Sequence, residues 1–224
     1  MSESVCEATG GVGPDGAAAP RNPPGDVPAA ARELRPGRQR MLTVARRLFC
    51  SQGYDRTPLR AISDALGVTK AAVYYHFKAK DDILVAIVTP VLDRIDQLVD
   101  SASGPLHDPD DRRRFLQRYV DLLSTDADIT TLLLGDPVVT EHPLGRRFAA
   151  QREQIRSLLG ADESLPAGIR TSTALRTLEL ALGEFGDADP AQVRETALSI
   201  AIAVLDAGGA AEGPSASASA PEMA

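Results

Sequence analysis

The stretch TPLRAISDALGVTKAAVYYHFKAK, residues 57–80, decides the fold. Thr57 is a suitable helix N-cap with Pro58 at the first helical position, and Thr69 is a second N-cap twelve residues on. Between them, Gly67 can adopt the positive φ that a sharp turn requires. The stretch therefore predicts two short helices joined by a turn, which is a helix-turn-helix unit.

The second of these helices is predicted to have an inward and an outward face. An apolar set holds it against the first helix, and this set comprises Ile62, Leu66, Val68, Val73 and Phe77. On a helical wheel Ala71 and Tyr75 point away from that set, with Lys70 and Tyr74 beside them. Small side chains allow close approach of the backbone, and tyrosines can contact phosphates or thymine methyl groups. This face suits the major groove of DNA.

The rest of the chain also predicts helices. Aromatic residues make up only 4% of the 224 residues and Trp is absent, so the core must consist of Leu, Ile, Val and Ala. We expect an all-α protein of about nine helices. The expected helices lie at about 38–52, 57–66, 69–76, from 80 past a kink at Pro90, from 109, from 128, at 143–159, at 166–184 and at 190–207.

Composition divides the chain into four parts. Residues 1–31 and 208–224 are rich in Gly, Pro, Ala and Ser and are expected to be disordered arms. Between them we expect a helix-turn-helix DNA-binding domain at 32–80 and a second, helical domain at 81–207.

Charge is distributed unevenly between these parts. The formal net charge is −7, which alone argues against a nucleic-acid-binding protein. Residues 32–80, however, contain eleven basic and three acidic residues, a net +8, while the remainder contains 13 basic and 28 acidic residues, a net −15. A basic module on an acidic body favours DNA binding through one end.

Other functional classes find little support. The two cysteines and three histidines have no metal-ligand spacing, and Cys50 is expected to be a packed, inert thiol. No sequence motif of a hydrolase or metalloprotease and no P-loop appears. Residues 11–16 match GxGxxG, but they follow no strand, open no helix and contain a proline, so they are not interpreted as a nucleotide site. We therefore expect no enzyme, no cofactor and no metal. The longest wholly apolar runs are residues 83–88 and 200–205, far short of a membrane span, and a cytoplasmic protein without membrane contact is expected.

Residues 40–88 resemble the N-terminal domain of the TetR (tetracycline-repressor-like) family. The matching positions occur in order and without a gap: Ala45, Leu48, Phe49, Gly53, Tyr54, Thr57, Ile62, Ala65, Gly67, Val68, Thr69, Val73, Tyr74, His76, Phe77, Lys80, Ile83 and Leu84. Ser63 and Pro58 depart from the family pattern without threatening the fold.

The resemblance implies roles for individual residues in DNA binding. Arg60 and Lys70 would contact base edges, since both are long donors that can reach guanine. Tyr75 would contact either bases or phosphates. The phosphate contacts would come from Thr57, Tyr74, His76 and Lys80. Thr69 and Ala71 complete the predicted interface. Packing of Tyr74 on its own helix and a capping role for His76 are the alternatives.

The C-terminal half carries no further sequence signature. The resemblance implies that its last two helices form a four-helix bundle with those of a second copy. The predicted dimer residues are the apolar stripes Leu175, Leu178, Leu182, Ala197, Ile200, Ala201 and Val204; intramolecular packing is the alternative. Polar candidates for contacting a small, apolar effector are His107, Arg118, Tyr119, Asp126 and His142.

The sequence thus predicts a ligand-responsive regulator, a repressor that binds a palindromic operator in double-stranded DNA as a homodimer and is released by a small molecule. The alternative is an architectural or adaptor DNA-binding protein without a ligand. A well-formed apolar cavity in the C-terminal domain would distinguish the two.

Overall fold

The computed structural model describes residues 29–160, 164–185 and 188–207, and within these ranges it contains ten α-helices and no strand. The chain divides into a first unit, Met1–Pro36, and a second, Gly37–Ala224. The first contributes only the beginning of the first helix to the described residues, and the account below concerns the second. The tail predicted at 208–224 and all but the last three residues of the arm predicted at 1–31 lie outside the described residues.

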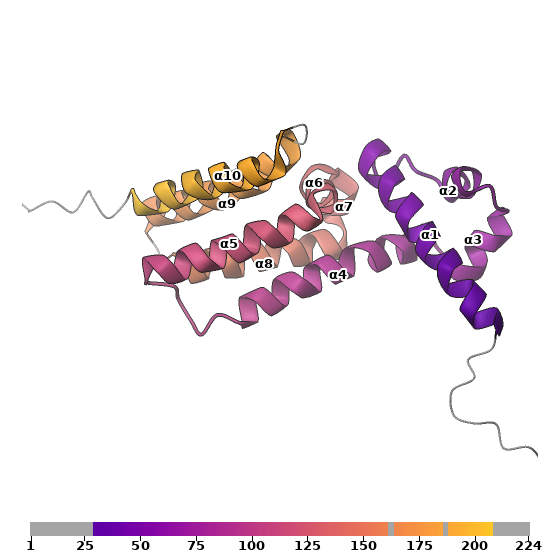
Figure 1. Cartoon of the computed structure of the whole chain (residues 1–224), viewed down its shortest axis with the longest axis horizontal. Coiled ribbons are helices and arrows are strands. Elements are labelled where there is room, and N and C mark those ends of the chain that lie inside the picture. Colours follow the sequence, from indigo (N-terminus) through magenta and orange to yellow (C-terminus); the bar gives the residue numbers. More distant parts are fainter. Residues whose placement is uncertain (1–28, 161–163, 186–187, 208–224) are drawn as a thin grey trace, which may run out of the picture. The chain divides into compact units, whose positions relative to one another are not determined.

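The helices follow the predicted order closely (Figure 1). They are α1 (Ala29–Gln52), α2 (Leu59–Leu66), α3 (Lys70–His76), α4 (Lys80–Asp100), α5 (Pro109–Thr125), α6 (Ala127–Gly135), α7 (Pro137–Glu141), α8 (Pro143–Leu159), α9 (Leu165–Glu184) and α10 (Pro190–Asp206). The all-α fold is confirmed.

Most helix starts coincide with a capping side chain. Asp108 accepts hydrogen bonds from the N–H groups of Asp110 and Asp111 at the start of α5, and Ser164 and Asp189 cap α9 and α10 in the same way. Each of these caps is followed within two residues by a proline. An N–H group in the first helical turn has no acceptor within the helix, so proline, which has no N–H, loses no hydrogen bond there. The starts of these helices are therefore encoded locally.

Three boundaries differ from the prediction. The first helix begins at Ala29 rather than near residue 38. The second begins one residue late with Pro58 as its N-cap, because the Thr57 hydroxyl donates to the Gly53 carbonyl (2.8 Å) instead of capping. The short α7 was not predicted; Asp136 caps it by accepting from the N–H groups of Val138 and Val139. Pro90 lies inside α4, and a kink there stays a prediction.

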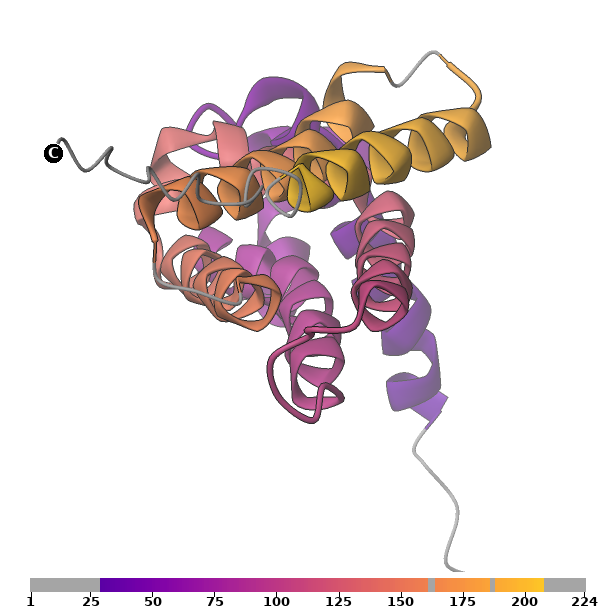
Figure 2. The ribbon, with the colours of Figure 1, turned by 90° about the vertical axis from the view of Figure 1, so that its left-hand side faces the viewer.

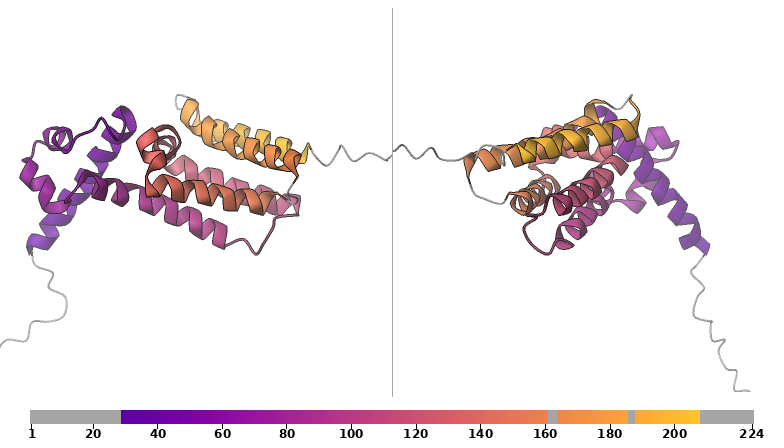
Figure 3. Two further views of the ribbon diagram at one scale, coloured as in Figure 1. Left: turned by 180° about the vertical axis from the view of Figure 1, so that it is seen from behind. Right: turned by 60° about the vertical axis from the view of Figure 1, so that its left-hand side comes forward.

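The C-terminal helices form a bundle whose core is aliphatic. α4 packs against α8 and α5, while α9 and α10 lie side by side and cover the others as a second layer (Figures 2 and 3). Fully buried members of this core include Leu92, Ile95, Leu116, Leu123, Ile155 and Leu175. Burial of each such side chain contributes about 1.5–3 kcal/mol, so the bundle is held by its apolar faces.

Candidate nucleic-acid interface

The turn between α2 and α3 has the geometry that the sequence predicted. Gly67 ends α2 in the left-handed region with φ +67°, and its N–H donates to the Asp64 carbonyl. Thr69 then begins α3, where its hydroxyl oxygen accepts from the Ala72 N–H (3.2 Å). These two local features set the direction of α3 after α2.

Packing gives α3 one buried and one exposed face. Val73 is fully buried and Phe77 is 3% exposed, and both belong to the core that contains Ile62. Tyr75, on the opposite face, is 70% exposed and Tyr74 is 45% exposed. Val68 was expected in the apolar set but is 38% exposed, because it lies in the turn beyond the end of α2. The exposed side of α3 is thus available to a partner.

Cations on this module lie close to aromatic rings. The Lys70 ammonium is 5.4 Å from the centroid of the Tyr74 ring, and the Arg38 guanidinium is 4.9 Å from that of Phe77. Such contacts orient long side chains without neutralising them. Arg38 was not among the predicted interface residues. The sequence shows only that it belongs to a basic segment and does not distinguish it from other basic residues of α1, such as Arg46.

Two predicted phosphate contacts have other partners. Thr57 is fully buried, and its hydroxyl donates to Gly53, so its side chain cannot reach a phosphate in this conformation and that prediction is corrected. The Lys80 ammonium donates to the carbonyls of Tyr54 (2.9 Å) and Asp55 (3.3 Å) and lies over the Tyr54 ring. Lys80 therefore ties the start of α4 to the loop after α1, and only its remaining donor capacity is left for DNA.

The other predicted residues lie at the surface of the module. Thr69, Ala71 and Lys70 are exposed, and His76 is half-buried with its ring against those of Tyr75 and Phe77. Arg60 is exposed on α2 and pairs with Asp64 one turn later (3.5 Å). Such an exposed pair contributes little and leaves Arg60 able to exchange partners.

The module is the predicted helix-turn-helix domain, residues 32–80. Besides its direct continuation into α4, it contacts the bundle through residues 126–142, which we call the connector. Arg46 on α1 donates to Asp126 (2.7 Å) and to both oxygens of Asp128, and Asp126 also accepts from Arg94 on α4. Burial alone would raise the pKa of Asp128, but hydrogen bonds from Arg46 and its charge outweigh that effect and lower it. The Asp128 carboxylate thus stays charged, and both Asp126 and Asp128 hold α1 through Arg46.

Two further contacts link the connector to the loop after α1 and to the start of α4. Asp136 accepts a hydrogen bond from the Tyr54 N–H (2.7 Å). The preceding residue, Gly53, has a positive φ of +88°, a conformation that favours glycine. His142 accepts from the Leu144 N–H at Nδ1, so its Nε2 carries the proton and donates to Asp81 (2.7 Å). Asp126 and His142, predicted as effector contacts, therefore lie between the module and the bundle in this structure.

The remaining predicted effector residues are separated. His107 is exposed in the loop before α5, and Arg118 lines a pocket at the end of α4. Tyr119 is fully buried and donates to Glu179 on α9 (3.2 Å). The structure does not bring the five predicted residues into one site.

Burial also corrects the predicted dimer residues. Leu175, Leu178, Ala197 and Ala201 are almost completely buried inside the protomer, where they pack as part of its core, while Leu182 and Val204 are half-buried. Of the predicted set only Ile200 is well exposed, at 48%. A different apolar surface is open beside it: an α9–α10 groove of about 420 Å³, lined by Leu180, Phe185, Val193, Ile200 and their neighbours.

Other predicted properties can be compared with the described residues. Burial raises the pKa of Cys50 to about 12, which fits a packed, unreactive thiol; Cys6 lies outside the described ranges. No cluster of three or more potential metal ligands occurs in the described part of the chain. In the same residues, no helix is long and apolar enough to span a membrane.

Comparison with known proteins places the module in a family. Residues 41–87 match the model of the bacterial regulatory proteins of the tetR family. The chain is 46% identical over 56 residues to the regulator AcrR of Shigella flexneri, covering 25% of this chain and 26% of AcrR. It is 30% identical over 105 residues to the transcriptional repressor AcnR of Corynebacterium diphtheriae, covering 47% of this chain and 54% of AcnR. The matches thus span from a quarter to about half the length of these relatives.

Solved structures extend the likeness of fold to the bundle. The ketosteroid transcriptional regulator KstR2 of Mycobacterium tuberculosis matches with a TM-score of 0.61 at 18% identity, covering 77% of this chain and 94% of KstR2. At that identity the match concerns the fold alone.

Proposed function

The chain belongs to the TetR family of bacterial regulatory proteins through its helix-turn-helix domain, and we propose that it is a ligand-responsive transcriptional regulator that binds a palindromic operator as a homodimer. The TetR family consists of transcription regulators and not of enzymes. The observation that carries the proposal is the exposed face of α3, where Lys70, Tyr74 and Tyr75 surround small alanines while Val73 and Phe77 anchor the helix from behind.

A second copy is proposed because one helix-turn-helix contacts a single half-site. Two copies related by a two-fold axis would present two α3 helices to successive major grooves. The α9–α10 groove supports this assembly, since Leu180, Phe185 and Ile200 are each about half exposed there and would be covered by the same surface of another chain. The proposed dimer face is therefore this outward surface, in place of the buried stripes.

The proposed response to an effector operates through α4 and the connector. α4 begins at Lys80, beside the DNA-binding module, and continues for 21 residues into the bundle. The connector holds α1 through Arg46 and the loop after α1 through Tyr54. A ligand that binds one arrangement of these helices better than another would change the separation of the two α3 helices and so the affinity for DNA.

The sign of regulation is proposed to be negative. AcnR carries the name of a repressor. The regulator FasR of Mycolicibacterium smegmatis, 25% identical over 138 residues, is named an activator. A repressor is the simpler device for this chain, because occupation of a promoter requires no further contact with polymerase.

Selection of sheared genomic DNA by the purified protein, followed by sequencing, tests the proposal. We expect a palindrome with half-sites about one helical turn apart, roughly 10 base pairs. The double variant Lys70→Ala/Tyr75→Ala should lose that enrichment, whereas Arg113→Ala, an exposed change on α5, should keep it. Enrichment without sequence preference, equal in all three proteins, would instead support an architectural role.

A further inference from the structure

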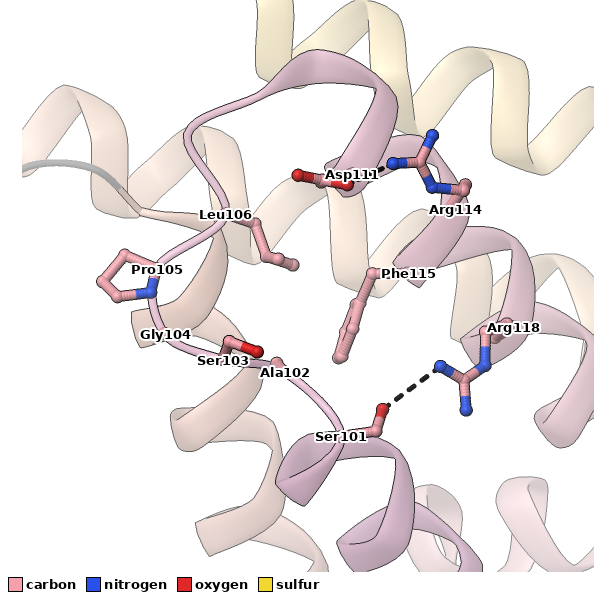
Figure 4. A pocket seen from close by; sticks show the side chains of 10 residues that line it. All are labelled: Ser101, Ala102, Ser103, Gly104, Pro105, Leu106, Asp111, Arg114, Phe115 and Arg118. Atoms are coloured by element: carbon pink, nitrogen blue, oxygen red, sulfur yellow. Dashed lines mark hydrogen bonds and ion pairs between the residues drawn. The ribbon is translucent and has the colours of Figure 1, made fainter.

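A pocket of about 380 Å³ lies at the corner where α4 ends and α5 begins (Figure 4). Its wall on one side is the loop 101–106 and on the other the first turns of α5. The Leu106 N–H donates to the Leu158 carbonyl at the end of α8 (2.7 Å), so the loop is anchored to the bundle. This pocket is distinct from the α9–α10 groove and from the connector.

The polar side of the pocket includes two guanidinium groups and two serine hydroxyls as hydrogen-bond donors, with the Asp111 carboxylate as an acceptor. Arg118 donates to the Ser101 hydroxyl (3.1 Å) and forms no ion pair with any described residue. The backbone N–H groups of Ser103 and Gly104 have no hydrogen-bond partner among the described residues either. Free N–H donors beside an unpaired guanidinium favour an anionic group.

The charges of the lining set a limit on that anion. Arg114 also lines the pocket but pairs with Asp111, another lining residue (Figure 4). The lining therefore carries one net positive charge, that of Arg118. A singly charged group is balanced by it, while a doubly charged phosphate would leave an excess of negative charge next to Asp111.

The floor of the pocket is apolar. Phe115 is 5% exposed, and its side chain extends from α5 toward the loop near Ala102 (Figure 4). Leu106 lines the same pocket from the loop. A ligand that reaches the Arg118 guanidinium can therefore place a short hydrocarbon part on the Phe115 ring, where it is removed from water.

We propose that this pocket binds a monocarboxylic acid with a short apolar chain, its carboxylate on Arg118 and the loop N–H groups and its chain on Phe115 and Leu106. The planar guanidinium can bind the two oxygens of a carboxylate side by side. The net positive charge of the lining disfavours a cationic ligand. A neutral apolar ligand would leave Arg118 and the loop N–H groups without hydrogen-bond partners.

The position of the pocket connects it to DNA binding. Ser101 is the C-cap of α4, and the opposite end of the same helix carries Lys80, which holds the loop of the DNA-binding module. With a rise of about 1.5 Å per residue, α4 spans about 30 Å between these points. The acid is thus the effector in this inference, which rests on the proposed function and names its ligand class.

Binding of hexanoate, hexanol and hexylamine to the full chain, followed by NMR, tests the inference. Hexanoate should bind saturably and the other two at least about tenfold more weakly; titration to about 10 mM is needed, because so small a ligand binds in the millimolar range. Arg118→Gln should weaken hexanoate binding about tenfold. Asp111→Asn should strengthen it, since it frees Arg114 and removes a negative charge. Arg113→Gln, one residue before Arg114 but outside the pocket, is the matched control.

Equal binding of hexanol and hexanoate, unchanged binding by Arg118→Gln, or no saturable binding would each overturn the inference. The opposite effects expected for Arg118→Gln and Asp111→Asn exclude loss of folding as their common cause, and circular dichroism checks each variant. Operator binding without ligand is measured in parallel. If the operator is bound but hexanoate is not, the pocket assignment fails and the proposed function stands. If hexanoate is bound but no operator is, the pocket assignment stands and the proposed function fails.

Discussion

Glu179 is an acidic side chain placed in the interior of the bundle. Its Oε1 accepts from Arg152 Nε (2.6 Å) and from the Tyr119 hydroxyl, while Oε2 has no partner in the described structure. Burial raises the pKa of Glu179, and Arg152 and Tyr119 offset this only in part. The pKa of Glu179 is higher in the folded than in the unfolded chain, so the folded chain is more stable with this residue protonated. That contribution to the free energy of unfolding is fully present below the ordinary pKa of 4.5 and is lost as the pH rises through the folded pKa.

Replacement of this residue by glutamine should therefore change how stability depends on pH. Glu179→Gln keeps an acceptor for Tyr119 and Arg152 but cannot ionise. The free energy of unfolding of the variant, relative to the natural chain, should rise as the pH increases above the ordinary value of 4.5, because only the natural chain becomes charged in the core. Urea titrations across this range measure the difference. A difference that is constant with pH would show that Glu179 does not titrate there.

The connector makes contacts between residues up to 82 positions apart in the sequence. Asp126 is only 9% exposed at its side chain and joins Arg46 on α1 to Arg94 on α4. Because α6 follows immediately, any movement of α6 within the bundle must either carry α1 along or break these ion pairs. The connector is thus a place where a change in the bundle can act on the DNA-binding module.

A double-mutant cycle on Arg46→Gln and Asp126→Asn should give a coupling energy of about 1–2 kcal/mol, since the pair is largely shielded from water but Arg46 is one-third exposed. The free energies of unfolding of the four proteins provide the value. Asp100→Asn, an exposed acid that forms no ion pair among the described residues, should change stability by less than about 0.5 kcal/mol. Additive effects of the two connector changes would contradict the assigned contact.

For the whole molecule, the proposed dimer requires a surface that two chains can share. The outward surface of α9 and α10 exposes Leu180 at 46%, Phe185 at 58% and Ile200 at 48%. Their neighbours Leu178 and Ala201 are completely buried and do not line this surface. Substitutions of the exposed residues can therefore separate association from folding.

A charge on this surface should prevent dimer formation. Ile200→Glu would place a carboxylate in a face that is apolar and covered in the dimer, so the mass in solution should fall from twice the chain mass to the single-chain value of 23.7 kDa. Sedimentation equilibrium measures this mass. Val138→Glu, at a residue on α7 that is 44% exposed, is the matched control and should leave the dimer intact. A dimer that persists in Ile200→Glu, or is lost equally in both variants, would place the interface elsewhere.

The helices and the helix-turn-helix unit were determined by the sequence itself, because caps such as Thr69 and Asp108, the turn at Gly67 and the apolar period all act within a few residues. Contacts between residues far apart in the chain could not be predicted in this way. The apolar period of α9 and α10 is the same whether the stripe faces its own core or a second chain, and packing placed Leu178 and Ala201 inside. Likewise, only the tertiary structure brought Asp126 to Arg46 and removed Thr57 from the DNA-binding surface, because burial and charge pairing depend on which helices meet.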